Sequence, residues 1–303
     1  MNKDLLSLKD LSATDLAELL DLSLLIKKNY KNNIGTKVLT DKSFALIFEK
    51  PSTRTYVSFD IAINQLGGHC VTLPPTSLGG RESLHDFAKT LSRYVQGIII
   101  RTFSHKTVQE LALHSTIPVI NALSDKYHPC QILADYQTII EHKGHHKLKV
   151  AFLGDGYNIA NSLMELCAIV GFDLHISTPQ GYEPEESIVK EMSALAKTNG
   201  GAISITNNPE IAIKQADIVY TDTWTSMGHE KEADIRSNVF KTHQVNSKLL
   251  ALAKDNFLVM HCLPAHRGKE ITDEVMDSKQ SIVFDQAENR LHMQKAVLCK
   301  LYS

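Results

Sequence analysis

The stretch PSTRT, from Pro51 to Thr55, places hydroxyl groups and a guanidinium between the apolar run SFALIF and the helix-periodic segment YVSFDIAINQL. A turn that opens a helix presents backbone N–H groups and the positive end of the helix dipole, and Arg54 with the hydroxyls adds donors that suit phosphate oxygens. The stretch therefore predicts a phosphate-binding turn, although it lacks the glycine-rich Walker A pattern. The alternative is that Ser52 or Thr53 only caps the helix and that Arg54 is a surface charge.

Further polar groups follow other apolar runs in the first half of the chain. Arg101 comes after GIII, and the segment from His128 to Gln131 comes shortly after PVINAL. The carboxyl ends of parallel strands meet at one edge of a sheet, where ligands bind. Arg101 and His128 therefore favour the binding interpretation of the PSTRT turn.

The second half contains a glycine pair that resembles part of a dinucleotide-binding loop. Gly154 and Gly156 follow the run VAFL, but Ile159 stands where the third glycine of GxGxxG would fall. The next predicted strand, LHIST, ends without the acidic residue that binds a ribose. A dinucleotide oxidoreductase is therefore disfavoured, and Asn158 is either a binding group at the start of a helix or its N-cap.

Two other strand ends in this half carry groups that could do chemistry. Asp222 follows DIVYT and could hold an ammonium group, whereas Cys262 follows FLVMH within HCLP. A lone cysteine is either a buried apolar thiol or a polarisable group at a reaction centre. The histidines form neither HExxH nor another spaced ligand set, so no metal site is predicted.

These groups require a scaffold of alternating strands and helices. Ser12 and Asp15 predict the cap of a first helix, after which short apolar runs alternate with helix-periodic segments. The segment from Glu141 to Lys149 interrupts the alternation, and a second series follows, with predicted strands VAFLG, LHIST, AISIT, DIVYT, FLVMH and SIVF. The pattern predicts an α/β protein with two similar domains, each a mainly parallel sheet flanked by helices. A helix over Gln131 to His142 could cross between them.

Composition limits the classes of partner. The chain of 303 residues has a formal net charge of -2, which gives no basic field for nucleic acid. Its 5 cysteines form no CxxC pair, and no uncharged apolar run reaches membrane-spanning length. We therefore expect a cytoplasmic protein without a targeting segment that acts on a small molecule, not on nucleic acid or a membrane.

Taken together and in order, the motifs resemble the aspartate/ornithine carbamoyltransferase family, specifically its ornithine branch. The matching motifs are STRT, RTF, HPCQ, GDGxN, DxxxSMG, HCLP and ENR, and they cover nearly the whole chain. The resemblance implies a carbamoyl phosphate-binding domain at 1–140, an ornithine-binding domain at 141–285 and a C-terminal helix at 286–303 that returns to the first domain. It also implies an active site in the cleft between the domains.

The resemblance assigns a role to each matching residue. The carbamoyl phosphate-binding residues would be Ser52, Thr53, Arg54, Thr55, Arg101, His128, Gln131, Cys262, Leu263 and Arg290. The ornithine-binding residues would be Asn158, Asp222, Ser226 and Met227. Cys262, Arg101 and His128 would be catalytic.

The chain departs from the family pattern at three positions. Tyr56 stands where the family commonly has the second arginine of STRTR, and Tyr157 where it often has asparagine. Ser77 replaces a glutamine that, in the family, reaches carbamoyl phosphate from a neighbouring subunit. Ser77 is therefore not assigned to the site.

The implied reaction is transfer of a carbamoyl group from carbamoyl phosphate to the δ-amine of ornithine, with no metal or organic cofactor. The amine must be uncharged to attack, so activity should rise with pH. The alternatives are a sister enzyme that uses aspartate, putrescine or an acylated ornithine, and a non-catalytic binding protein. The resemblance also implies a homotrimer or a multiple of trimers, and arginine biosynthesis more than breakdown.

Overall fold

The structure is a computed structural model that describes residues 2–75, 78, 82–225, 228 and 230–302. The chain divides into two compact units. Unit 1 comprises Met1–Gln137 and Glu288–Ser303, and unit 2 comprises Thr138–Ala287. The division falls inside helices α5 (Pro129–Lys143) and α12 (Val283–Tyr302). The predicted cleft and the predicted boundaries at 140 and 285 stay predictions.

Unit 1 contains a parallel sheet of 4 strands in the order β2-β1-β3-β4. The strands are β1 (Ser43–Phe48), β2 (His69–Leu73), β3 (Gly97–Arg101) and β4 (Val119–Leu123). The helices are α1 (Ala13–Lys31), α2 (Thr53–Gln65), α3 (Leu84–Leu91), α4 (His105–His114) and the residues of α5 and α12 that belong to this unit. The predicted alternation of strands and helices is confirmed.

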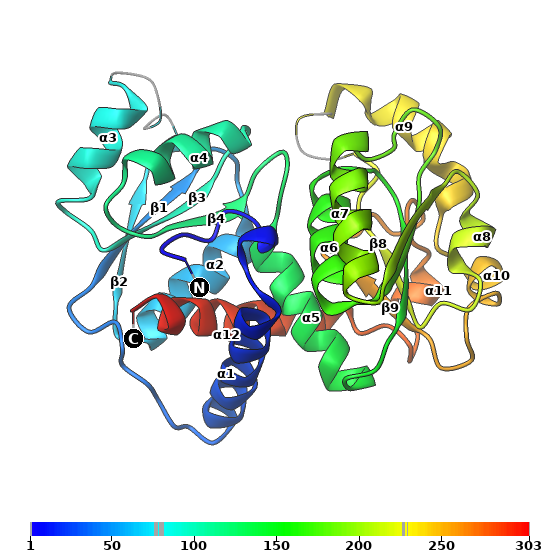
Figure 1. Cartoon of the computed structure of the whole chain (residues 1–303), viewed down its shortest axis with the longest axis horizontal. Coiled ribbons are helices and arrows are strands. Elements are labelled where there is room, and N and C mark those ends of the chain that lie inside the picture. Colours follow the sequence, from blue (N-terminus) through cyan, green and yellow to red (C-terminus); the bar gives the residue numbers. More distant parts are fainter. Residues whose placement is uncertain (1, 76–77, 79–81, 226–227, 229, 303) are drawn as a thin grey trace. The chain divides into compact units, whose positions relative to one another are not determined.

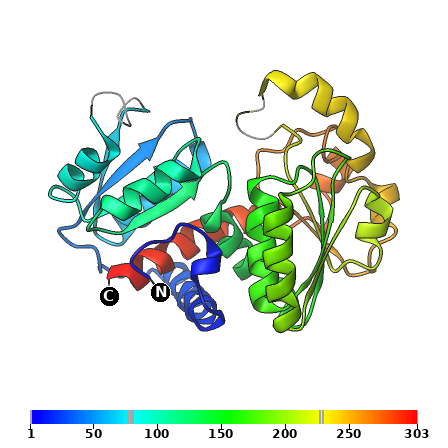
Figure 2. The ribbon, with the colours of Figure 1, turned by 45° about the horizontal axis from the view of Figure 1, so that its top comes forward.

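Helices cover both faces of this sheet (Figures 1 and 2). Alternate strand residues such as Ile47 and Ile98 pack with Leu91 of α3 and Leu111 of α4 in one apolar cluster. On the opposite face, the ring of Phe44 contacts Tyr302 of α12 at a centroid distance of 5.2 Å. Burial on both faces explains why β1, β3 and β4 read as continuous apolar runs, whereas the edge strand β2 is largely exposed.

The first helix begins as its sequence predicts. The Ser12 side chain accepts a hydrogen bond from the Asp15 backbone N–H at 3.1 Å, and the Asp15 carboxylate accepts one from the Ser12 N–H at 3.0 Å. This reciprocal capping box pairs two backbone donors that the helix leaves without internal partners. It fixes the residue at which α1 starts.

Unit 2 contains a parallel sheet of 5 strands in the order β7-β6-β5-β8-β9. The strands are β5 (Lys149–Leu153), β6 (Asp173–Ser177), β7 (Ala202–Thr206), β8 (Ile218–Thr221) and β9 (Leu258–His261). The helices are α6 (Asn158–Val170), α7 (Glu186–Thr198), α8 (Pro209–Ile213), α9 (Ala233–Val239), α10 (Ser247–Leu250), α11 (Asp273–Met276) and the unit 2 residues of α5 and α12.

The two faces of this second sheet are also covered. Helices α6 and α7 lie over one face, and α8, α10 and α11 lie over the other (Figures 1 and 2). Leu153, Val219 and Val259 from three of the strands share a buried cluster with Leu249 of α10 and Val275 of α11. Each unit therefore has an apolar core of its own.

The predicted strand SIVF is wrong. Ser281 forms only an isolated bridge with Val259, and α12 already begins at Val283. The Ile282 N–H donates to the Val259 carbonyl at 3.0 Å, which pairs the segment briefly with β9 before the backbone turns into the helix. A short apolar run suits both a buried strand and the buried first turn of a helix, so its composition did not distinguish them.

Among the described helices, none is both long and apolar enough to cross a membrane.

Candidate active site

The first polar cluster of unit 1 lies where strands β1 and β3 end. Phe48 pairs with Arg101 in the parallel register, so the PSTRT turn after β1 and Arg101 at the end of β3 share one edge of the sheet. The Arg101 guanidinium donates to the Ser52 hydroxyl at 3.1 Å. Ser52 precedes α2 but makes no side-chain cap hydrogen bond, so its hydroxyl faces Arg101 instead of the helix. Ser52 therefore occupies the N-cap position of α2 without capping the helix through its side chain.

Glu49 ties the same two strand ends together. Its backbone N–H donates to the Arg101 carbonyl at 3.0 Å, and its carboxylate accepts from the Phe103 N–H at 3.3 Å and from the Thr102 hydroxyl. These bonds fix the backbone on both sides of Arg101. Glu49 thereby limits where the guanidinium can lie.

Arg290 joins two further predicted residues from distant parts of the chain. Its guanidinium donates to the Thr55 hydroxyl at 3.0 Å and to the Gln131 side-chain oxygen. All three side chains are buried, with Arg290 only 4% exposed. The first turn of α2, the first turn of α5 and helix α12 therefore meet at one guanidinium within unit 1.

His128 immediately precedes α5 and is also buried. Burial, with the nearby charges of Arg290 and Arg101, holds its pKa well below the usual value of 6.5. The imidazole is consequently neutral at neutral pH, and it adds no positive charge to the two guanidinium groups. A neutral imidazole can still donate one hydrogen bond to an oxygen of a ligand.

Thr53 and Arg54, the other members of the turn, have exposed side chains at the start of α2. A helix begins here with the Tyr56 N–H bonded to the Ser52 carbonyl, so the preceding backbone N–H groups lack partners within the helix. Hydroxyls, guanidinium groups and a helix N-terminus therefore come together in unit 1. This combination suits an anion such as phosphate.

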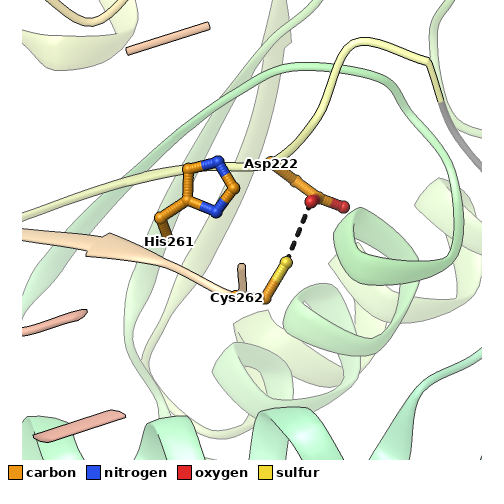
Figure 3. A group of neighbouring side chains, drawn as sticks. All are labelled: Asp222, His261 and Cys262. Carbon is orange, nitrogen blue, oxygen red and sulfur yellow. Dashed lines mark hydrogen bonds between the residues drawn. The ribbon is translucent and has the colours of Figure 1, made fainter. Parts of the chain in front are cut away.

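The second cluster belongs to unit 2 and pairs two predicted residues directly (Figure 3). Cys262, which follows β9, donates its thiol hydrogen to the Asp222 carboxylate with an S–O distance of 2.9 Å. The Thr223 N–H donates to the same oxygen, Oδ1, at 2.7 Å. The other oxygen, Oδ2, has no hydrogen-bond partner in the described part of the chain. Asp222 thus retains an acceptor for a cation.

His261 orders the backbone beside Cys262. Its Nδ1 accepts from the Leu263 N–H at 2.9 Å, so the ring proton lies on Nε2, which is 3.1 Å from a Glu270 oxygen. Leu263 has a φ of +56°, a conformation that non-glycine residues seldom adopt. The hydrogen bond to the buried imidazole helps to hold Leu263 in this conformation.

Donor atoms of Asp222, His261 and Cys262 all lie within 4.8 Å of one another. Such a set has the right elements for a transition metal. Both nitrogens of His261, however, already have hydrogen-bond partners, and coordination through that ring would break one of these bonds. The geometry therefore fits an ordered thiol–carboxylate pair better than a metal centre.

The glycine loop after β5 has a steric role. A Cβ on Gly156 would lie 2.3 Å from the Pro184 backbone nitrogen, so the close approach of the two backbones leaves no room for a side chain at this position.

Asn158 is buried as the first residue of α6, and Tyr157 occupies the N-cap position. The N-cap interpretation of Asn158 is therefore wrong. Ser226, Met227 and Ser77 lie outside the described residues.

The sequence interpretation missed three carboxylates beside the predicted residues. Glu49 directly follows β1, and Asp135 lies four residues after Gln131 on α5, so position and helical spacing could have indicated both. Glu270 stands in a loop with no periodic pattern. Only the folded chain brings it to His261.

Comparison with known families matches both halves of the chain. The family description "Aspartate/ornithine carbamoyltransferase, carbamoyl-P binding domain" matches residues 3–141. The description "Aspartate/ornithine carbamoyltransferase, Asp/Orn binding domain" matches residues 146–301.

Individual relatives match over almost their full length. The ornithine carbamoyltransferase of Methanosarcina mazei is 50% identical over 99% of both chains. A catabolic ornithine carbamoyltransferase of Thermoplasma acidophilum is 48% identical, also over 99% of both. The crystal structure of an anabolic ornithine carbamoyltransferase from Campylobacter jejuni is 37% identical, covers 99% of both chains and has a TM-score of 0.94. The chain therefore belongs to the aspartate/ornithine carbamoyltransferase family of enzymes.

Proposed function

We propose that this enzyme transfers the carbamoyl group of carbamoyl phosphate to the δ-amine of L-ornithine, giving L-citrulline and phosphate. The observation that carries the proposal is the pairing of Cys262 with Asp222 at 2.9 Å, which leaves Asp222 Oδ2 available to an ammonium group. An amino acid with a free α-amine supplies such a group. The names of the relatives support the same acceptor.

Carbamoyl phosphate is proposed to bind through unit 1. Ser52, Thr53, Arg54 and Thr55 would hold the phosphate with Arg101, while His128 and Gln131 would hold the carbamoyl group with Arg290. The Arg101–Ser52 bond at 3.1 Å and the Arg290–Thr55 bond at 3.0 Å support this assignment. Both guanidinium groups are already oriented by neighbours, which reduces the ordering required when an anion binds.

Ornithine is proposed to bind through unit 2. Asp222 would pair with the α-ammonium group, Asn158 would meet the α-carboxylate end, and Ser226 with Met227 would close over the amino acid. Backbone groups of Cys262 and Leu263 would contact the carbamoyl amide, and the Cys262 thiol would take part in proton transfer near the attacking amine.

The proposed reaction requires stabilisation of the negative charge that develops on the carbonyl oxygen, and it requires no cofactor. As the δ-amine attacks, the carbonyl oxygen gains negative charge that Thr55, Arg101 and a neutral His128 can stabilise through hydrogen bonds. Phosphate leaves and can accept the amine proton. Preorganised hydrogen-bond donors of this kind lower the activation barrier because they need little reorganisation during the reaction.

Several wider features belong to the same proposal. Residues 1–140 would form the carbamoyl phosphate-binding domain, 141–285 the ornithine-binding domain, and 286–303 a helix returning to the first domain. We also propose a cytoplasmic homotrimer that acts in arginine biosynthesis. Relatives include enzymes named anabolic and catabolic, so measured rates in both directions are needed to test the metabolic role.

The test is an assay of carbamoyl phosphate with ornithine, aspartate, putrescine and N-acetylornithine, each offered separately, with detection of phosphate and of the carbamoylated product. We expect ornithine to be the preferred acceptor and citrulline the product. Preference for another acceptor would overturn the ornithine assignment. Absence of any transfer would overturn the enzymatic proposal.

A further inference from the structure

The buried face of α5 carries a row of polar side chains that only partly belongs to the proposed site. His128 immediately precedes α5, and Gln131 and Asp135 follow it at intervals of three and four residues, which places these two along one face of the helix. All three are buried, and Asp135 has no exposed surface. Asp135 is an ionisable group in the interior of unit 1, and it is not among the proposed substrate-binding residues.

Asp135 determines which way the amide of Gln131 points. The Gln131 Nε2 donates to Asp135 Oδ1 at 2.9 Å, while Gln131 Oε1 accepts from the Arg290 guanidinium. An ionised carboxylate only accepts hydrogen bonds and a guanidinium only donates them. The two neighbours therefore permit a single orientation of the amide, because a flipped amide would oppose donor to donor and acceptor to acceptor.

The same row balances charge in the interior. Burying a guanidinium is costly unless hydrogen bonds and an opposite charge compensate it. When ionised, Asp135 supplies a negative charge that the Gln131 amide links to Arg290 through successive hydrogen bonds. His128 cannot serve this purpose, since its burial and the two guanidinium groups hold its pKa low and keep it neutral.

We propose that Asp135 is a positioning residue for carbamoyl phosphate binding. It fixes the Gln131 amide, which holds one side of the Arg290 guanidinium, so that the other side meets the Thr55 hydroxyl at 3.0 Å. Asp135 touches no substrate in this account, and it acts through Gln131 and Arg290. The inference rests on the proposed function, because it assumes that these groups bind carbamoyl phosphate.

The decisive variant is Asp135→Asn, which keeps the shape of the side chain but removes its charge and lets its amide present either an oxygen or an NH2 group. Gln131 then loses its fixed orientation. We expect the KM for carbamoyl phosphate, and the Kd for a phosphonate analogue of carbamoyl phosphate measured by calorimetry, to rise by about tenfold to a hundredfold, as for loss of a charged hydrogen-bond partner. The KM for ornithine should change less than twofold.

A second variant separates orientation from simple loss of stability. In Asp135→Asn combined with Gln131→Glu, the carboxylate moves to position 131, where it can accept both from the new amide at position 135 and from Arg290. We expect this exchange to recover most of the affinity for the phosphonate analogue that is lost in Asp135→Asn, even if kcat stays low because the Gln131 amide is gone. An affinity for the analogue that remains as low as in the single variant would overturn the proposal.

Ser23→Ala provides the matched control. Ser23 donates to Gln137, another buried polar side chain of α5, with an O–O distance of 2.5 Å. Its loss should lower the melting temperature without changing the affinity for the phosphonate analogue. If Asp135→Asn lowered only the melting temperature, as this control does, Asp135 would be merely structural. A wild-type enzyme without transfer activity would instead reject the proposed function, and the two failures are therefore distinguishable.

Discussion

At the scale of single residues, hydrogen-bond direction determines what the predicted side chains can do. The Cys262 thiol and the Thr223 N–H both use Oδ1 of Asp222, so an incoming ammonium group has Oδ2 as its acceptor. The two hydrogen bonds also hold the carboxylate in place. An acceptor with a fixed orientation discriminates well between ligands, because a ligand that lacks the matching donor leaves the acceptor without a hydrogen bond.

Asp222→Asn should remove most of the preference for ornithine over putrescine, which lacks the α-ammonium group. An acceptor that leaves polar groups of the occupied site unpaired loses roughly 1–3 kcal/mol of binding energy for each, so putrescine should be poorer by about a hundredfold in kcat/KM. Steady-state kinetics with both acceptors checks this. Full discrimination by the variant, or equal use of both amines by the wild type, would show that Asp222 does not select the acceptor.

Arg54→Ala should weaken binding of a phosphonate analogue of carbamoyl phosphate by roughly 1.5–3 kcal/mol, the usual worth of hydrogen bonds to charged groups. The side chain is exposed at the start of α2, so the fold should not suffer. Arg93→Ala, another exposed arginine of unit 1, is the control and should leave the affinity unchanged. Calorimetry that finds equal affinity for wild type and Arg54→Ala would exclude Arg54 from the site.

At the scale of elements, the sequence predicted the strands well, and the inner strands are apolar because both parallel sheets bury them on both faces. The buried run SFALIF coincides with β1, and the half-exposed run AISIT coincides with the edge strand β7. The sequence failed at SIVF, where the same apolar composition serves the start of a helix. The sequence also could not predict which side chains would pair. Arg290 and Thr55 are separated by 235 positions of the chain, and no local pattern encodes their contact.

The loop between β5 and α6 shows how an element can depend on one small residue. A Cβ at position 156 would meet the backbone of Glu183 at 2.5 Å and that of Pro184 at 2.3 Å, and backbone atoms cannot turn aside as a side chain can. At Gly154 the nearest atom is the end of the Phe152 ring, at 3.3 Å.

Gly156→Ala should therefore destabilise unit 2 by about 1–3 kcal/mol, as overpacking commonly does, and should displace the start of α6 with Asn158. Gly154→Ala should cost less, because the nearest atoms belong to the Phe152 side chain and the nearest backbone atom, the Asp222 nitrogen, is 3.8 Å away. Chemical denaturation and the KM for ornithine measure the two effects. If the two variants were equally stable, the loop would be able to accommodate a Cβ at position 156, and the close backbone contact would not require glycine there.

At the scale of the whole molecule, each unit buries a histidine that folding keeps neutral. Burial lowers the pKa of His243 in unit 2 to about 4, and burial with two nearby guanidinium groups holds the pKa of His128 in unit 1 well below 6.5. In the unfolded chain both imidazoles take up a proton near pH 6.5. Below that pH the unfolded state binds more protons than the folded state, so acid favours unfolding.

The free energy of unfolding should consequently fall as pH drops below about 6.5, by at most about 1.4 kcal/mol per pH unit for each histidine. The loss due to His243 should level off near pH 4, where the folded form is also protonated.

Denaturant titrations at pH 7, 6 and 5 give the free energy of unfolding at each pH. The slope of this free energy against pH should be smaller for His128→Gln and for His243→Gln than for the wild type. His145→Gln, on an exposed side chain, should keep the full slope. Because the two histidines lie in separate cores, each variant should change the pH dependence of its own unit if the units unfold in separate steps. An unaltered slope in both buried variants would show that other groups cause the acid sensitivity.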